Sequence, residues 1–189
     1  MVFVERPATT PPTTDARYAS DALTDVHNPM GYPPRVRGKA LAPRLDSLDD
    51  KTVFLVDCHF DDSGLLLEQV QAWFAEHMPR VRTRLVEKAN VYARDDPELW
   101  SRIKTEGDAA IVGVGHCSSC APAVTAHAMT LDHAYGVPTV MLHTSTFEHV
   151  IRSTARMNGM PSMRAAFVPM PVMARPPPSW PPMSLALTR

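Results

Sequence analysis

The sequence lacks both a charge excess and a long apolar run, and each absence argues against a class of protein. Lys and Arg number 19 against 20 Asp and Glu, so the formal net charge is -1. Proteins that bind nucleic acid normally carry a basic excess, and we therefore expect no nucleic acid partner. No apolar run approaches the roughly 20 residues of a membrane-spanning helix, and the N-terminus lacks the basic start and apolar stretch of a signal peptide. We expect a cytoplasmic protein that makes no use of a membrane.

Cysteine is scarce as well, with three in a chain of 189 residues. Three are too few for the disulfide framework of a small secreted domain. Two of them, Cys117 and Cys120, are separated by two residues. In a reducing compartment this spacing indicates redox chemistry or metal binding.

Proline, in contrast, is abundant and is concentrated at the two ends of the chain. Of the 19 prolines, seven lie before Leu45 and seven after Val168. Proline fixes φ and has no amide donor, so neither end can be mostly helix or inner strand. We predict an extended or disordered arm over residues 1–40, a single α/β domain over 41–168 and a Pro- and Met-rich arm over 169–189. The arms either pack on this domain or contact a partner subunit, and the second alternative predicts a homo-oligomer or a subunit of a complex.

Short apolar runs alternate with amphipathic helical patterns in the middle of the chain. The predicted strands cover residues 52–57, 81–88, 109–114, 137–143 and 165–168. One helix start is marked by Asp96 followed by proline, and another by Ser145 with Glu148 three residues later, which fits a capping box. Apolar strands that alternate with helices indicate a doubly wound, mostly parallel sheet. We predict the flavodoxin-like strand order 2-1-3-4-5.

Chemically reactive residues follow three of these predicted strands directly. They are Cys58 and His59 after the first strand, His116, Cys117 and Cys120 after the third, and His143, Thr144 and Ser145 at the end of the fourth. Ligands in such sheets bind beyond the carboxyl ends of the strands, where the winding reverses. The first and third strands are neighbours in the predicted order, about 4.8 Å apart. We therefore expect Cys58 and Cys117 to lie within reach of each other.

Structural interpretations stay open for some of these residues. Cys58 could be a small buried hydrophobic residue at a strand end, and His116 could be a loop residue that hydrogen-bonds the backbone. Inert thiols are a poorer explanation for Cys117 and Cys120. A loop before a helix N-terminus stabilises a thiolate through the helix dipole and free amides.

The stretch 113–147 resembles a family named for a Sec-Gly-Ser-Cys motif, the UGSC family, whose members often carry Cys in place of selenocysteine. The shared pattern is Gly-x-Gly, a Cys-x-x-Cys loop, a helix, then Gly-[Ile/Val]-Pro-Thr-Val and a Thr-x-x-Phe turn. Cys117 matches the selenocysteine position, and Ser119 and Cys120 match the Ser-Cys of the motif. That family is in turn similar to the selenocysteine-bearing subunits of glycine and D-proline reductases.

This chain departs from the family pattern at two places. Ser118 replaces the glycine of the motif, which leaves the loop less free. Cys58 and His59 stand where Asn-Gly-like residues would be expected, so the site gains a thiol. The resemblance to the reductases implies reductive cleavage of a carbon–heteroatom bond or a thiol–disulfide exchange.

Our leading hypothesis from the sequence is a thiol-dependent enzyme that acts on a small molecule. Cys117 would attack the substrate and Cys120 would resolve the adduct, with Cys58 as an alternative resolving thiol. A neighbouring imidazole, His143 or His116, would move the proton. The expected substrate-binding residues are His59, Ser118, Ser119, Thr144 and Ser145.

Two other functions remain as alternatives. Cys58, Cys117, Cys120 and His143 make a possible ligand set for zinc or another transition metal, and an open position on that metal could activate water in a hydrolase, lyase or hydratase. No cofactor is required by the thiol hypothesis. The chain could also be an accessory subunit that supplies part of a composite active site in a hetero-oligomeric enzyme.

Overall fold

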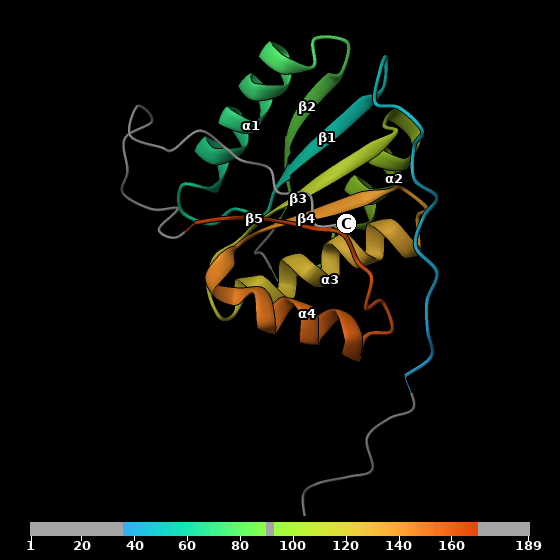
Figure 1. Cartoon of the computed structure of the whole chain (residues 1–189), viewed down its shortest axis with the longest axis vertical. Helices are drawn as coiled ribbons and strands as arrows, with labels where there is room; N and C mark the ends of the chain where they lie inside the picture. Colours follow the sequence, from blue (N-terminus) through green and yellow to red (C-terminus); the bar gives the residue numbers. More distant parts are fainter. Residues whose placement is uncertain (1–35, 90–92, 170–189) are drawn as a thin grey trace, which may run out of the picture. The chain divides into compact units, whose positions relative to one another are not determined.

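The computed structural model describes residues 36–89 and 93–169, and it contains the predicted sheet (Figure 1). All neighbouring strands are parallel, in the order β2-β1-β3-β4-β5. The strands are β1 (Thr52–Asp57), β2 (Arg82–Glu87), β3 (Ala109–Gly115), β4 (Thr139–Thr144) and β5 (Ala165–Val168). The flavodoxin-like order is therefore confirmed. Most of what we predicted for the two Pro-rich arms lies outside the described residues.

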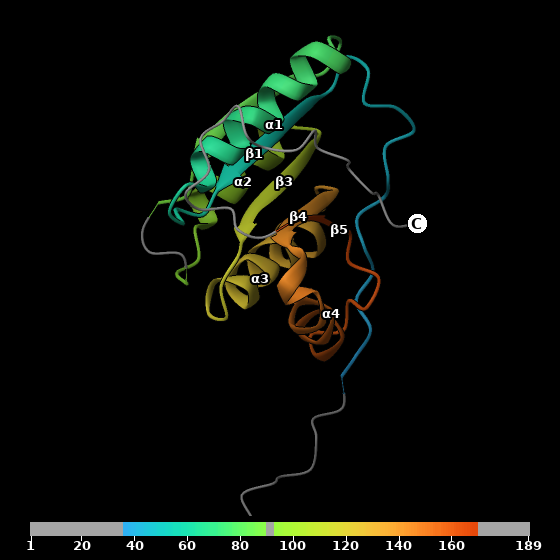
Figure 2. The same cartoon turned by 60° about the vertical axis from the view of Figure 1, so that its left-hand side comes forward.

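Helices cover both faces of the sheet, as the apolar strands required (Figure 2). They are α1 (Ser63–His77), α2 (Pro97–Glu106), α3 (Cys120–His133) and α4 (Glu148–Met157), with a short 3₁₀ turn, η2 (Ser145–Phe147), before α4. Leu66 and Val70 of α1 pack in one core cluster with side chains from β1, and Val124 of α3 and Ile151 of α4 belong to the other. The winding of the sheet thus reverses between β1 and β3, which places any site of this fold type at their carboxyl ends. Within the described residues, no helix is long and apolar enough to cross a membrane.

The two predicted helix starts have different outcomes. The Asp96 carboxylate accepts a hydrogen bond from the Leu99 amide at 3.1 Å, so the cap of α2 is confirmed. The capping box at Ser145 is wrong, because the chain leaves β4 in the 3₁₀ turn η2 and α4 begins only at Glu148. Neither η2 nor α4 begins with a side-chain cap hydrogen bond. Glu148 instead forms an ion pair at 3.5 Å with Arg152, one turn further along the helix.

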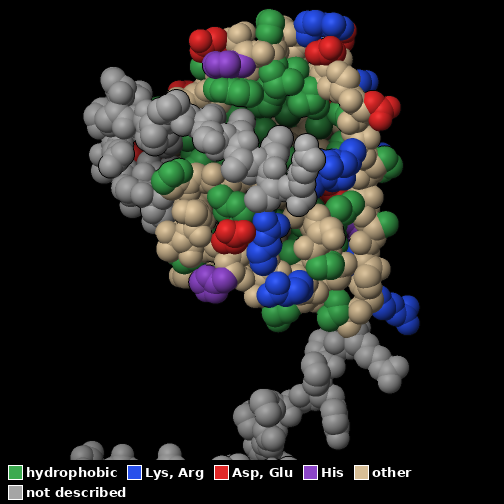
Figure 3. Space-filling model, in the orientation of Figure 1, with side chains coloured by type: hydrophobic (Ala, Val, Ile, Leu, Met, Phe, Trp, Pro, Cys, Tyr) green, Lys and Arg blue, Asp and Glu red, His purple; other side chains and the backbone are tan. Residues whose placement is uncertain are grey.

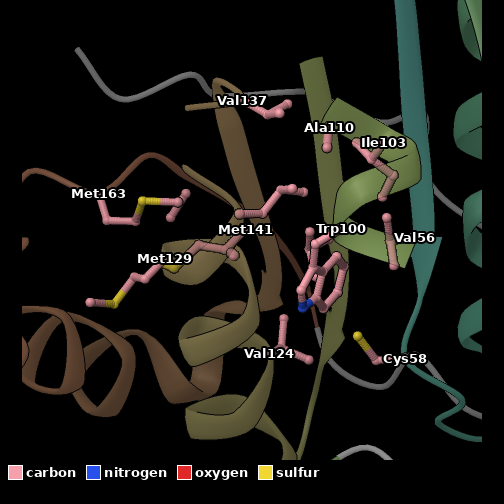
Figure 4. Close-up of a cluster of buried hydrophobic side chains, with 14 of the residues drawn as sticks. Val56, Cys58, Trp100, Ile103, Ala110, Val124, Met129, Val137, Met141 and Met163 are labelled. Carbon is pink, nitrogen blue, oxygen red and sulfur yellow. The ribbon is translucent and has the colours of Figure 1, made fainter. Parts of the chain in front are cut away.

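The core between the sheet and the helices α2, α3 and α4 is built around Trp100 (Figure 4). This indole is fully buried, as are the thioethers of Met141 and Met163 on the β4–β5 side. Cys58 lies in the same cluster as Trp100 and Val124. Flexible thioethers can fill irregular space around a rigid aromatic residue, which allows close packing in this core.

A buried carboxylate joins the N-terminal described segment to the end of the sheet opposite the reactive residues. Asp132, near the end of α3, accepts hydrogen bonds from the amides of Ala42 at 2.7 Å and Thr139 at 3.0 Å. It also forms an ion pair with Arg164 at 2.9 Å. The start of β4 and the start of β5 are therefore held by one side chain. On the face shown in Figure 3, basic and acidic side chains are interspersed, in line with the balanced composition.

Candidate functional site

The turn between β3 and α3 brings Cys117 and Cys120 together. Both are free cysteines, and their sulfur atoms lie 2.6 Å apart. Cys120 is the first residue of α3, so the pair stands where the helix has amide groups without partners inside the helix. The predicted position of the pair, a loop leading into a helix N-terminus, is confirmed.

The backbone of this turn directs amide hydrogens at both sulfur atoms. The Cys120 amide donates to Cys117 Sγ at 3.1 Å, and the Ser119 hydroxyl lies 3.4 Å from the same sulfur. The amides of His116 and Cys117 donate to Cys120 Sγ at 3.3 and 2.9 Å. A sulfur that accepts such hydrogen bonds is stabilised as a thiolate.

The two thiols differ in their affinity for a proton. Partial burial alone would raise the pKa of Cys117, but hydrogen bonds from the Cys120 thiol, the Ser119 hydroxyl and the amides of both residues outweigh it and lower that pKa. Burial, followed by the hydrogen bond to Cys117, raises the pKa of Cys120 to about 12. Cys117 is also partly exposed, whereas Cys120 is buried. The pair therefore combines an accessible, more acidic thiol with a buried thiol that keeps its proton.

Cys58 lies on the interior side of this pair. Its amide donates to the Gly113 carbonyl at 2.8 Å, and its side chain is fully buried. Burial raises its pKa to about 12, although the nearby positive charge of Lys88 opposes this. The charge of Cys120 also raises the pKa of Cys58, so the two residues are close enough to interact. This agrees with our expectation that the cysteines gather at one end of the sheet. A buried, protonated thiol cannot meet a substrate that arrives from solvent without a conformational change.

The imidazole of His143 is buried beneath the turn. Its Nε2 lies 3.3 Å from the Thr125 hydroxyl, which donates to the Ala121 carbonyl at 2.8 Å. Burial lowers the pKa of His143 to about 3, so the ring is neutral at physiological pH. The hydrogen-bond partner of this ring among the described side chains is on α3 and is not a cysteine. The contacts of His143 therefore support the turn from below.

His116 lies on the other side of the same turn. Its ring meets that of Phe60 edge to face, with centroids 5.4 Å apart, and its Nε2 is 3.7 Å from the Asp61 carboxylate. Only 6% of the residue is exposed. Both contacts come from the connection between β1 and α1, so His116 joins the turn of β3 to that of β1.

The predicted substrate-binding residues do not share one environment. His59 is exposed, adopts a left-handed φ of 58° and lies 3.8 Å from Glu87. Thr144 is fully buried at the end of β4. The remaining three are exposed: Ser118, Ser119 and Ser145. Of the five, Ser119 is the one with a hydrogen bond to a cysteine sulfur.

Two polar residues of this region were missed by sequence reasoning. Lys88 is fully buried directly after β2, and its ammonium group donates to the Ala89 carbonyl at 3.0 Å. Thr125 is buried on α3 and links His143 to the helix backbone. The sequence signal that could have found them was their position. Lys88 ends the second predicted strand, and Thr125 adjoins the inner stripe of a helix.

The metal site considered as an alternative is not assembled. Within residues 36–89 and 93–169, no group of three or more His, Cys, Asp or Glu side chains is arranged to hold a metal ion. Cys117 and Cys120 are adjacent, but Cys58 packs in the core and His143 hydrogen-bonds Thr125 below the turn. The four residues proposed as ligands therefore lie in three different surroundings and do not face a common point.

A flavodoxin-like sheet with a cysteine pair at the helix N-terminus beyond β3 defines an α/β protein with a thiol site. The chain belongs to the UGSC family, whose model matches residues 25–178. The family resemblance found in the sequence is thereby confirmed. Comparisons with curated proteins and with solved structures gave no match.

Proposed function

We propose that this protein is a thiol-dependent enzyme that uses Cys117 and Cys120 for covalent or redox chemistry on a small molecule. The observation that carries the proposal is the difference between the two thiols. Cys117 is partly exposed with a lowered pKa, and Cys120 is buried with a pKa raised to about 12. A nucleophile needs access and thiolate character, whereas a resolving thiol must stay protonated until an adduct forms.

The proposed reaction has two steps. The Cys117 thiolate first attacks an electrophilic sulfur or carbon, a bond to Cys117 Sγ forms, and the leaving group departs with the bonding electrons. Cys120 then gives its proton to the departing fragment, and its sulfur attacks Cys117 Sγ. The fragment leaves in reduced form and the two cysteines remain as a disulfide, so the substrate gains the two electrons that the thiols lose. An external dithiol reductant returns the pair to its starting state.

The chain belongs to the UGSC family. The resemblance of that family to reductase subunits, inferred from the sequence motif, favours reductive cleavage or thiol–disulfide exchange over hydrolysis. Such chemistry requires a compartment that keeps thiols reduced, and for this reason we expect the protein to work in the cytoplasm. An accessory subunit is the alternative if the cysteine pair proves unreactive. Metal-dependent hydration has less support, because its four expected ligands are not gathered.

The direct test is alkylation of the reduced protein by iodoacetamide at a series of pH values, with each cysteine followed by mass spectrometry. We expect Cys117 to react with a midpoint clearly below that of an ordinary thiol, while Cys120 and Cys58 react slowly. Mild oxidation should produce a disulfide between Cys117 and Cys120. Slow alkylation of all three thiols with ordinary pH dependence would contradict the proposal.

A further inference from the structure

A cavity of about 550 Å³ lies against the start of β5, away from the cysteine pair. This volume is typical of small-molecule sites. Three parts of the chain form its walls: the segment before β1, the helix α4 and the connection from α4 into β5. Figures 1 and 2 both show the segment before β1 running alongside that connection, and the Lys39 amide donates to the Gly159 carbonyl at 2.8 Å.

The register of β4 and β5 separates this cavity from the thiol site. Ala165, which lines the cavity, pairs with Met141, whereas Val168 pairs with Thr144, the last residue of β4. Three residues of a strand span about 10 Å. The cavity is therefore at the amino end of β5, while the cysteine pair follows the carboxyl end of β3. A ligand bound here is distinct from the substrate of the thiol site.

The cavity is lined by positive charge. Three of its lining residues are arginines, namely Arg44, Arg152 and Arg164, and among the described residues that line it none is Asp or Glu. The chain as a whole is balanced, with a formal net charge of -1. Three guanidinium groups around one cavity are thus a local feature, which favours an anionic ligand.

Arg164 is held in place by its contacts beside the cavity. Its guanidinium pairs with the buried Asp132 carboxylate at 2.9 Å and donates to the Ala42 carbonyl at 2.9 Å. The Ala42 amide in turn donates to Asp132 at 2.7 Å. These contacts take two of the five N–H groups that a guanidinium carries. They also tie the segment that bears Arg44 to the start of β5, so this wall is formed before a ligand arrives.

Arg152 is held in a similar way, whereas Arg44 is not. Arg152 pairs with Glu148 at 3.5 Å, and its guanidinium lies over the Phe167 ring, 5.3 Å from the ring centroid. The exposed Arg44 side chain has no ion pair or hydrogen bond to another residue in the described ranges. The carboxylates of Asp132 and Glu148 offset two of the three positive charges, and the charge of Arg44 remains.

The chemistry of these groups selects the ligand. Guanidinium groups match the oxygens of a phosphate, and a phosphate monoester carries a charge of about -1.5 to -2 at pH 7. Leu41 and the buried Met163 place apolar surface in the same cavity, which suits an organic body attached to the phosphate. We propose that this cavity binds a phosphorylated small molecule through Arg44, Arg152 and Arg164.

The test is calorimetric titration of the full chain with phenyl phosphate, which has a phosphate group and a compact apolar body. We expect saturable binding of one molecule per chain with a Kd of about 1 mM or below. Inorganic phosphate should bind more weakly because it lacks the apolar body, benzoate should bind more weakly because it carries less charge, and phenol should not bind. Absence of saturable binding, or benzoate binding as tightly as phenyl phosphate, would overturn the proposal.

Two variants separate this cavity from general attraction to a basic surface. Arg44→Gln should weaken phenyl phosphate binding about tenfold or more, because it removes the charge that has no carboxylate partner. Arg102→Gln is the matched control, since Arg102 is another exposed arginine and lines a different cavity together with Glu106. It should leave the Kd within about twofold. Equal weakening in the two variants would contradict the proposal.

A third variant keeps this result independent of the proposed thiol chemistry. Cys117→Ser should bind phenyl phosphate as tightly as the wild type, because the cysteine pair is at the other end of the sheet. Phenyl phosphate should also raise the melting temperature of the wild type and of Cys117→Ser more than that of Arg44→Gln, since a ligand that binds the folded state stabilises it. Loss of binding in Cys117→Ser would place the phosphate at the thiol site and refute the separate cavity. Binding by a protein whose Cys117 proves unreactive would refute the thiol enzyme alone.

Discussion

The imidazole of His143 occupies the space that a side chain at residue 115 would need: a Cβ atom on Gly115 would overlap the ring and lie 3.0 Å from the Cα of Ala121. Glycine is therefore required at this position by the neighbouring strand and by α3. The close approach lets His143 fill the space below the cysteine turn.

Gly115→Ala should accordingly destabilise the protein by about 1–3 kcal/mol, because the ring and the turn must move apart. Urea denaturation measures the loss. Gly38→Ala is the matched control, since a Cβ there would have nothing within 4 Å. A Gly115→Ala protein as stable as the control would show that the ring relocates without cost.

Cys120→Ala should make Cys117 less reactive at neutral pH. The substitution removes the Cys120 side chain, whose hydrogen bond with Cys117 lowers the pKa of Cys117, and so raises that pKa toward its ordinary value. Each unit of that rise lowers the thiolate fraction about tenfold at a pH below the pKa. The iodoacetamide rate against pH measures it, with Cys58→Ala as the comparison that should leave the midpoint nearly unchanged. An unshifted midpoint in Cys120→Ala would mean that the Cys120 thiol is not what acidifies Cys117.

The stability of the protein should fall as the pH is lowered below about 6.5. Burial lowers the pKa of folded His143 to about 3, whereas the unfolded chain takes up this proton near its ordinary value of 6.5. Between these values the unfolded state binds more protons, so stability rises with pH and is lost as the pH falls.

From pH 6.5 to pH 5 the His143 contribution amounts to about 2 kcal/mol at most, at 1.36 kcal/mol for each unit. Denaturation of the wild type and of His143→Gln at several pH values isolates it, because the variant has no proton to gain at this position. Parallel pH profiles for the two proteins would show that the ring is accessible to protons in the folded state.

Asp132→Asn should cost about 3–5 kcal/mol, because it leaves the charge of Arg164 without its buried partner. Glu148→Gln breaks the exposed ion pair with Arg152 and should cost at most about 1 kcal/mol. Thermal unfolding of both variants measures the difference. If the two variants lost similar stability, Asp132 would not be the anchor of the β4 and β5 starts.

The sheet could be predicted from the sequence because an apolar run such as Thr52–Asp57 is stable only where its side chains are buried. All six residues of this strand are buried. Right-handed crossovers indicated a doubly wound sheet, and the flavodoxin-like order predicted for it is the order found. The same pattern located the cysteine pair at the end of β3, since a strand end and a helix start bracket that turn.

The depth and direction of single side chains could not be predicted in this way. Ser145 and Glu148 have the spacing of a capping box, but the 3₁₀ turn moves the helix start beyond the serine. The zinc hypothesis placed Cys58 and His143 at the correct strand ends. It did not predict that Cys58 packs in the hydrophobic core, or that His143 hydrogen-bonds Thr125. The position of a residue in the strand pattern predicts at which end of the sheet it lies. Which side chains then contact one another depends on how the helices pack against the sheet. The expected roles of the two arms in oligomer formation stay predictions.

The backbone around the cysteine pair serves both sulfur atoms at once. One amide, that of Cys120, is aimed at Cys117, and two, those of His116 and Cys117, are aimed at Cys120. Amide donors are therefore already in place at whichever of the two sulfur atoms carries negative charge. Such donors are built into the chain and need not turn to solvate that charge.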